Sequence, residues 1–304
     1  MLPSENGRFP ASELADSPIM CHVTTPEFEH FLLTRFNVRH ETRASERWLR
    51  HRLDYFERLC RHSVMRQSAK NFRWLIYFDA ERDEWFQNEI DRLSAGVFEP
   101  VWVDGPLSSS KAALAVQERA SAEWVITTRM DNDDAIARDY IESVQHQFSR
   151  QEMEFVNFQA GLQMSDPGEL FHRSDPSGPF VSLIERRSDK PLRGVYVGRH
   201  DRISEHGPVR QVVAHPMWLQ MVHDLNLGNA LRGLRANPDL LARYFDVDAH
   251  PLPVSRINLW ASQLKTAWQL SIHILRKPHR LAWVYRVAVN RLVRKSRSQA
   301  SEPQ

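Results

Sequence analysis

Three carboxylates lie within four positions of one another, directly after an apolar segment. The stretch WVITTRMDNDDA, residues 124–135, carries Asp131, Asp133 and Asp134. Like charges this close repel one another, whereas the hard oxygen atoms of carboxylates suit Mg²⁺ or Mn²⁺. A divalent cation would remove the repulsion, and magnesium commonly shares its ligands with the phosphate groups of a substrate. The pattern therefore favours a metal site that also meets phosphate.

A helix N-terminus is the alternative interpretation of these acids. Asp133 or Asp134 would cap the helix, and the helix dipole would favour the remaining negative charges. We favour the metal site because three acids, rather than one, follow an apolar run. An EF-hand loop starting at Asp131 is disfavoured, since Ala135 replaces an oxygen ligand and Ile136 replaces the required glycine. Walker A, GxGxxG, HExxH and GxSxG patterns are missing from the sequence.

Short apolar runs alternate with helical patterns in the first half of the chain. This alternation predicts an α/β fold, with a mostly parallel sheet flanked by helices. Ligands of such sheets bind beyond the carboxyl ends of the strands, so Asp131 is expected to face the binding crevice. Ser110 is the expected N-cap of the third helix. The expected strands are 27–38, 71–79, 98–105 and 123–130, and the expected helices are 45–68, 81–96, 108–122 and 135–150.

The pattern changes after residue 151. Short strand-like runs follow at 153–164, 168–174, 180–187, 194–200 and 209–223, which predicts a mixed or antiparallel second half. A helical pattern then runs over 258–297 with an interruption at Pro278. We expect a flexible polar tail at 1–26, one domain at 27–255 and a basic helical segment at 256–304.

Composition places the chain among ordinary globular proteins. Hydrophobic residues make up 42% and charged residues 26% of it. The sequence has neither a long uninterrupted apolar window nor a signal-peptide pattern, and Cys21 and Cys60 lack the spacing of metal ligands or of a disulfide framework. These features predict a cytoplasmic protein.

The net charge of +2 conceals an uneven distribution. Residues 261–300 hold nine Lys or Arg and no acid, and residues 1–260 have a net charge of −6. Leu281, Val284, Tyr285, Ala288 and Leu292 form a stripe at helical spacing, although Trp283 and Val287 lie off it. The segment could bind an anionic membrane surface, or it could form a helical pair packed on the domain. Basic charge and aromatic residues alone do not make nucleic acid a favoured partner.

Four ordered stretches carry a resemblance to a known family: FLLTRFNVR, FRWLIYFD, VITTRMDNDDA and PMWLQMVHDLNLGNALRG. Together they resemble the putative rhamnosyl transferase family of GT-A-type glycosyltransferases, over about residues 31–233. The resemblance implies a GT-A-like (Rossmann-like) fold. It also implies metal-dependent transfer of a sugar, rhamnose by the family name, from a nucleotide-sugar donor to a hydroxyl of a glycan or lipid-linked acceptor. Such an enzyme would work in the cytoplasm, peripherally on the inner face of the membrane.

The resemblance also implies roles for individual residues. Asp131 and Asp133 match the D-x-D signature and would bind Mn²⁺ or Mg²⁺, with His223 as a further ligand of the metal or diphosphate. Asp79 matches an acid that contacts the base or ribose. The implied donor-binding set is Thr34, Arg35, Asn37, Asp79, Arg129, Asp134 and Asn226. His215 is the weaker candidate among the late histidines.

A carboxylate should accept the proton of the acceptor hydroxyl if the reaction inverts configuration. The candidates after the D-x-D are Asp166, Asp201, Glu205 and Asp224. The sequence does not choose among them, and Glu205 is the named candidate. Two other functions stay open: a metal-dependent nucleotidyl or phosphoryl transferase, and a non-catalytic binding protein whose acidic loop is only a helix cap.

Overall fold

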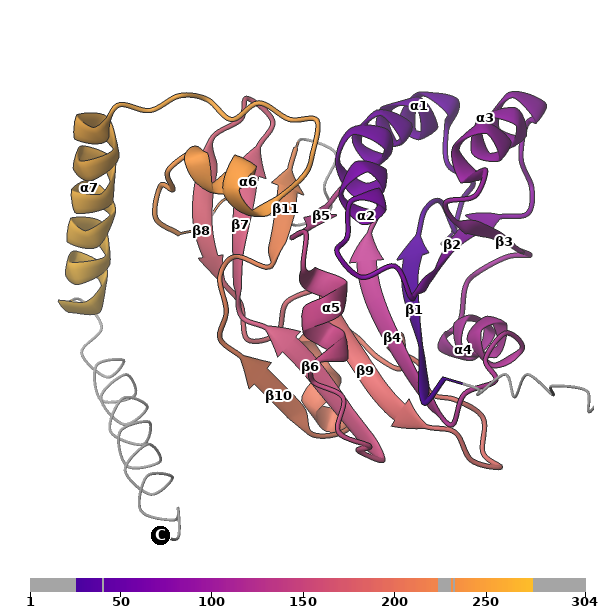
Figure 1. Cartoon of the computed structure of the whole chain (residues 1–304). Helices are drawn as coiled ribbons and strands as arrows, with labels where there is room; N and C mark the ends of the chain where they lie inside the picture. The colour runs from indigo at the N-terminus through magenta and orange to yellow at the C-terminus, as the bar shows by residue number, and fades with distance from the viewer. Residues whose placement is uncertain (1–25, 40, 224–230, 232, 276–304) are drawn as a thin grey trace, which may run out of the picture.

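The larger of two β-sheets forms the centre of the molecule (Figure 1). The computed structural model describes residues 26–39, 41–223, 231 and 233–275. The sheet order is β10-β6-β9-β4-β1-β2-β3, where β9 alone runs antiparallel to both of its neighbours. The mostly parallel α/β sheet predicted from the sequence is therefore confirmed. The strands are β1 (Phe28–Arg35), β2 (Arg73–Asp79), β3 (Glu99–Val103), β4 (Trp124–Asp131), β6 (Met153–Phe158), β9 (Val181–Arg186) and β10 (Val209–Val212).

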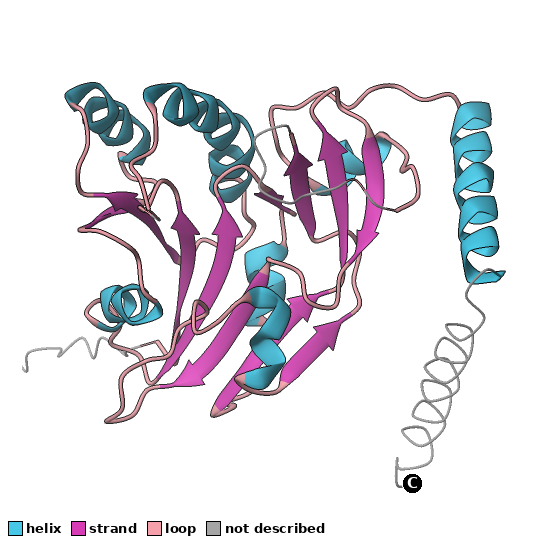
Figure 2. Cartoon of the chain, turned by 180° about the vertical axis from the view of Figure 1, so that it is seen from behind, coloured by secondary structure: helices cyan, strands magenta, loops and turns pink. Residues whose placement is uncertain are grey.

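Helices cover both faces of this sheet because both faces of its strands are apolar (Figure 2). Leu32 of β1 packs in one core with α1 (Glu46–Tyr55), α3 (Glu84–Ser94) and α5 (Tyr140–Gln145). The next residue, Leu33, points to the opposite face and packs with α4 (Ser109–Gln117). Helix α1 continues through a π-helical segment, Phe56–Arg61, into α2 (His62–Met65).

A smaller sheet lies beside the carboxyl end of β4. It has the order β5-β11-β7-β8, and it consists of β5 (Ala135–Ile136), β7 (Ala160–Ser165), β8 (Leu170–Ser174) and β11 (Trp218–Val222). Gly161 is required in β7, since a Cβ there would lie 2.1 Å from the Trp218 ring. Helix α6 (Asp239–Tyr244) contributes Leu241 to the core of this sheet. The predicted mixed second half is thus divided between the two sheets.

Helix α7 (Arg256–Leu275) stands at the edge of the molecule, on the side of the smaller sheet (Figures 1 and 2). The side-chain amide of Gln263 donates a hydrogen bond of 3.1 Å to the carbonyl of Arg235. The predicted helix over 258–297 agrees with α7 up to Leu275. Its remainder lies outside the described residues, and so do residues 1–25 of the tail predicted at 1–26.

Some predicted elements were wrong. The helix expected at 135–150 begins only at Tyr140, because Ala135–Ile136 pairs with β11 as a strand. The run expected as a strand at 194–200 forms a loop up to residue 199, and a 3₁₀ segment, His200–Glu205, begins at its last residue. Ser108, not Ser110, caps α4, and its hydroxyl accepts from the backbone N–H of Lys111 at 3.2 Å. These errors share a cause: each outcome depends on a partner or geometry that the local pattern does not contain.

A histidine is buried inside the larger sheet. His30 of β1 lies 2.8 Å from the hydroxyl of Thr128, which in turn lies 2.6 Å from the Ser182 hydroxyl. Burial lowers the pKa of His30 to about 3. The unfolded chain takes up a proton at this residue below about pH 6.5, while the folded chain does not. His30 therefore makes the folded state less stable as the pH falls from about 6.5 toward 3.

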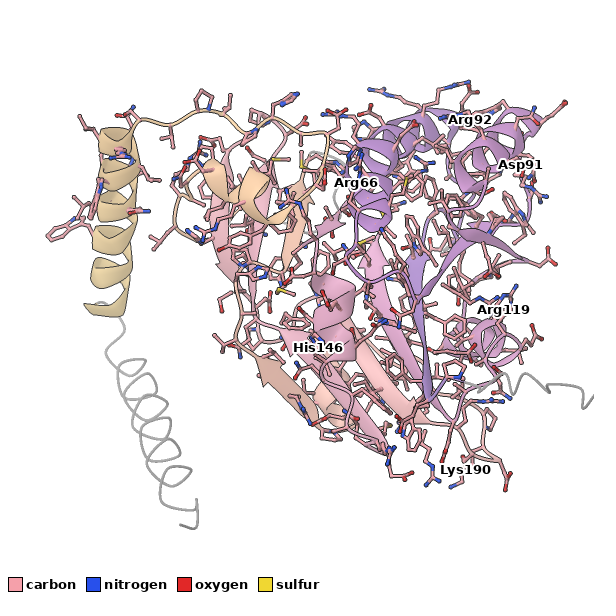
Figure 3. All side chains as sticks on the ribbon, viewed as in Figure 1. Arg66, Asp91, Arg92, Arg119, His146 and Lys190 are labelled. Carbon is pink, nitrogen blue, oxygen red and sulfur yellow. The ribbon has the colours of Figure 1, made fainter. Side chains whose placement is uncertain are left out.

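Replacing His30 by Gln should reduce this pH dependence. Between pH 7 and pH 5 the wild-type free energy of unfolding should fall about 2 kcal/mol further than that of His30→Gln. Urea denaturation at the two pH values measures the difference. His146→Gln, at an exposed position after α5 (Figure 3), controls for the loss of an imidazole. Parallel pH curves for wild type and His30→Gln would contradict the prediction.

Candidate functional site

A cleft of ≈ 660 Å³ opens at the carboxyl ends of β1 and β4. The parallel register places Arg35, the last residue of β1, beside Asp131, the last residue of β4. Both side chains line the cleft, together with residues from the start of α4 and from the loop before the 3₁₀ segment. The lining consists of Arg35, Leu107, Ser108, Ser109, Arg129, Asp131, Tyr196, Gly198, Arg199 and His200.

Tyr196 supports two arginines in the wall of the cleft. Its hydroxyl donates a hydrogen bond of 3.1 Å to the carbonyl of Leu33. The guanidinium carbons of Arg35 and Arg129 lie 5.0 Å and 5.4 Å from the centre of its ring. These are cation–π distances. Burial raises the pKa of Tyr196 to about 12, although the two arginines oppose the shift, so the ring stays neutral and the positive charges remain.

Asp131 supplies negative charge to this positively charged cleft. Its side chain is 37% exposed, and one carboxylate oxygen lies 3.5 Å from the guanidinium of Arg129. Burial opposes ionisation, but Arg129, Arg35 and His200 outweigh it and lower the pKa of Asp131. The carboxylate is therefore ionised and open to the cleft.

The first turn of α4 adds backbone donors. Ser108 and Ser109 line the cleft at the start of the helix, where N–H groups lack partners within the helix. Such a terminus attracts anions. Together with Arg35, Arg129 and Arg199 it gives the cleft the chemistry of a phosphate-binding site, and a volume that matches a small-molecule pocket.

Asp133 is turned into a group of side chains, which we call the acid–histidine cluster: Arg52, Tyr55, Asp133, Asp166 and His223. Tyr55, Asp133 and His223 are buried, Arg52 is partly buried, and Asp166 is the exposed member. Asp133 forms an ion pair with Arg52, and its carboxylate lies 3.0 Å from Nε2 of His223. The His223 ring stacks on Tyr55, with centroids 4.7 Å apart. Tyr55 donates a hydrogen bond of 2.6 Å to Asp166. The cluster thus joins α1, the acidic loop, the β7–β8 turn and the end of β11.

Asp134 fixes the acidic loop to the smaller sheet. Its carboxylate accepts from the backbone N–H of Met221 at 2.9 Å, and its side chain is buried. Burial raises the pKa of Asp134, and the negative charges of Asp133 and Asp131 raise it further. Since β11 ends at Val222, this contact brings His223 onto Asp133.

The helix-cap interpretation of the acids is wrong. Residues 132–134 form a turn that leads into β5, and α5 begins only at Tyr140. Asp131, Asp133 and Asp134 instead each contact different groups.

The donor types of Asp131, Asp133 and His223 fit Mn²⁺ or Mg²⁺. Within the described part of the chain, no three His, Cys, Asp or Glu side chains are arranged as a set of metal ligands. Arg52 occupies the carboxylate of Asp133, so a cation that binds there has to displace the guanidinium.

Several predicted donor residues lie outside the lining of the cleft. Thr34 is fully buried, and its hydroxyl accepts from the indole N–H of Trp74 at 3.0 Å. The side chain of Asn37 accepts from the backbone N–H of Asp79 at 3.2 Å, and Arg39 binds the Asp79 carboxylate at 3.0 and 3.1 Å. These contacts stabilise the end of β2. Asn226 lies outside the described residues.

The candidate proton acceptors also occupy different environments. Glu205 is exposed at the end of the 3₁₀ segment, and Asp201 is paired with Arg199 at 3.0 Å. Asp166 belongs to the acid–histidine cluster. Asp224 lies outside the described residues.

His215 is kept in a local contact away from the acids of the loop. It lies 3.0 Å from the carboxylate of Asp139, and its ring stacks on Tyr244.

The sequence interpretation missed Arg52, Ser108, Tyr196, Arg199 and His200. Ser108 had a visible signal, since a serine-rich helix start after a strand is typical of an anion site. Tyr196 to His200 were hidden in a run interpreted as a strand. Arg52 was one of many arginines on a helix, and its contact with Asp133 joins positions far apart in the sequence.

The family described as putative rhamnosyl transferase matches residues 26–234. Among solved structures, the chain is similar to S. aureus TarS 1–349 in complex with UDP, with 12% identity, a TM-score of 0.39, and coverage of 65% of this chain and 61% of that chain. For the TarS 1–349 complex with UDP-GlcNAc the identity is 10%, the TM-score is 0.41, and the match covers 70% of this chain and 64% of that chain. For HddC from Yersinia pseudotuberculosis the identity is 8%, the TM-score is 0.35, and the match covers 62% of this chain and 91% of that chain. No curated protein matches the chain. The match covers less than two thirds of the length of each of the two TarS 1–349 structures.

The ion pair of Asp133 predicts an unequal effect of removing the two acids. Asp133→Asn should destabilise the fold by about 3 kcal/mol, because it leaves the mostly buried charge of Arg52 without its partner. Asp131→Asn, at an exposed carboxylate, should cost less than about 1 kcal/mol. Urea denaturation with a chelator present measures both without metal. Equal losses would contradict the assigned partners.

Proposed function

Because the chain belongs to the putative rhamnosyl transferase family, a family of glycosyltransferases, we propose that it transfers a sugar from a nucleotide-sugar donor to an acceptor hydroxyl. The family name makes rhamnose the proposed sugar, and the proposed acceptor is a glycan or a lipid-linked glycan. The observation that carries the proposal is the positively charged cleft beside the acidic loop.

The proposed donor binds with its diphosphate against the arginines of the cleft. Arg35 and Arg129 are held on the ring of Tyr196, so their positive charges are positioned before the donor arrives. The N-terminus of α4 offers backbone N–H groups to the same phosphates. Preorganised charges of this kind stabilise the negative charge that develops on a leaving diphosphate.

We propose Asp131, Asp133 and His223 as the residues that hold Mn²⁺ or Mg²⁺. When bound, the cation would neutralise part of the diphosphate charge. The support is the donor chemistry of these side chains and the contact of 3.0 Å between Asp133 and His223. Without the cation, the guanidinium of Arg52 compensates the charge of Asp133. Arg52 is therefore the group that has to move when the cation binds.

Between the candidates for the proton acceptor, we prefer Asp166 to Glu205. Asp166 belongs to the same cluster as Asp133, and the hydroxyl of Tyr55 holds its carboxylate at 2.6 Å. Its backbone N–H donates to the carbonyl of Val222, next to His223. Both residues are exposed, but Glu205 lies outside the cleft lining and outside the cluster. A general base must be held near the proton that it accepts, which favours Asp166.

A nucleotidyl transferase would use the same kind of cleft and metal. The two functions differ in their products, because a glycosyltransferase releases a nucleoside diphosphate and a nucleotidyl transferase releases pyrophosphate. Incubation with a panel of nucleotide sugars and acceptor glycans, with and without Mn²⁺, followed by analysis of these products, tests the proposal. Pyrophosphate from a sugar phosphate and a nucleoside triphosphate would support the rival function.

We also propose that the enzyme acts in the cytoplasm, at the inner face of the membrane, where lipid-linked acceptors lie. The support is the basic segment after residue 260, with nine Lys or Arg and no acid over 261–300.

Asp131→Asn should weaken Mn²⁺-dependent binding of UDP at least tenfold, or about 1.4 kcal/mol. The substitution removes a carboxylate of the proposed metal site but disturbs the fold little, since the side chain is 37% exposed. Isothermal calorimetry with and without Mn²⁺ measures the effect. Asp189→Asn, at an exposed position outside the cleft lining, is the matched control. Unchanged UDP affinity in Asp131→Asn with Mn²⁺ present would count against the metal site.

Asp166→Asn should lower the rate of sugar transfer by about 100-fold or more, because a positioned general base contributes on that scale. Its affinity for UDP should stay that of the wild type. Glu205→Gln, tested beside it, should retain most of the transfer rate. A rate lost in Glu205→Gln and kept in Asp166→Asn would reverse the preference.

A further inference from the structure

Four large apolar side chains are exposed on one face of α7. Ile257, Trp260, Leu264 and Trp268 are 80%, 68%, 66% and 69% exposed. Their spacing of three, four and four residues places them within roughly 80° around the helix axis, at about 100° per residue. We call this set the α7 stripe. Single exposed apolar residues are ordinary on protein surfaces, but a continuous stripe with two tryptophans marks an interaction site.

The stripe faces away from the rest of the protein. Among the α7 residues whose burial is described, 256–265 and 268, the half-buried ones are Leu259, Ser262 and Gln263, and Gln263 bonds to the carbonyl of Arg235. At about 100° per residue, Leu259 and Ser262 lie on the side of the helix opposite to the stripe, and Gln263 lies between the two sides. The helix therefore contacts the protein through its more polar side and leaves its apolar side to a partner.

Charge indicates what kind of partner this is. Lys265 is exposed near the stripe, and the sequence over 261–300 contains nine Lys or Arg and no acid. A second copy of the chain would bring two such positively charged segments together, which is unfavourable. An anionic lipid surface attracts each of these cations, and tryptophan favours the boundary between lipid and water. Among the described residues, no helix is long and apolar enough to span a bilayer.

We propose that α7 lies in the plane of an anionic lipid surface, with the α7 stripe inserted among the lipids. The helix has the features of an in-plane amphipathic helix: an apolar face with tryptophans, a polar face, and neighbouring cations. This inference names the surface that produces the membrane location proposed above, and it does not depend on the identity of the donor or sugar.

Co-sedimentation of the full-length chain with lipid vesicles tests the proposal. At low salt the wild type should bind vesicles containing phosphatidylglycerol at least tenfold more tightly than vesicles of phosphatidylcholine alone. Higher salt should weaken this binding, because it screens the charges. The double substitution Trp260→Ser/Trp268→Ser should reduce binding at least tenfold. Val213→Ser is the matched control, because Val213 is 81% exposed and lies outside α7.

The proposal is wrong if the wild type stays in the supernatant when anionic vesicles are sedimented. It is also wrong if the double variant binds these vesicles as tightly as the wild type does. A dimer in light scattering that the double substitution dissociates would assign the stripe to a second copy. A large fall in the melting temperature of the double variant would show that the stripe packs inside the fold.

Calorimetric titration of the same preparation with UDP separates this proposal from the proposed function. UDP binding without vesicle binding contradicts only the membrane surface. Vesicle binding without UDP binding contradicts only the donor cleft, and it supports the α7 stripe.

Discussion

The ion pair between Asp133 and Arg52 is the interaction on which the arrangement of the site depends. Three carboxylates in four positions would repel one another if they shared one environment. The fold gives each a different one. Asp131 faces the arginines of the cleft, Asp133 binds Arg52 and His223, and Asp134 accepts from the backbone of β11. In the acidic loop Asp131 therefore stays ionised beside the arginines of the cleft and Asp133 is paired with Arg52, whereas burial raises the pKa of Asp134.

These separate contacts also fix how the two sheets meet. Asp134 and β5 attach the loop to β11, and β11 delivers His223 to Asp133. On the other side, the parallel register of β1 and β4 delivers Arg35 to Asp131. The loop thus divides a positively charged cleft, suited to phosphate, from a cluster that contains the two carboxylates Asp133 and Asp166. The proposed transfer from an anionic donor to a hydroxyl acceptor would use these two environments side by side.

The alternation of strands and helices could be predicted because buried strands and 3.6-residue periodicity are local properties of the sequence. The acidic loop, its place after a strand and the late histidine were also visible. The rest depends on distant partners. Ala135–Ile136 is a strand because β11 pairs with it, and Thr34 is a core residue in a central strand, where its hydroxyl accepts from Trp74. Similarly, Tyr196 gains its role from the two arginines that its ring supports.

The distribution of charge gives the two positive regions of the chain different consequences. The cleft cations lie in a part of the sequence, residues 1–260, whose net charge is −6, so acids elsewhere in this part more than offset their charge. The cations after residue 260 have no acids among them up to residue 300, so their attraction reaches further from the chain. An anionic surface then attracts the C-terminal segment and repels the body. The proposed attachment through α7 would therefore be oriented by charge, and it would leave the cleft free to receive the proposed anionic donor.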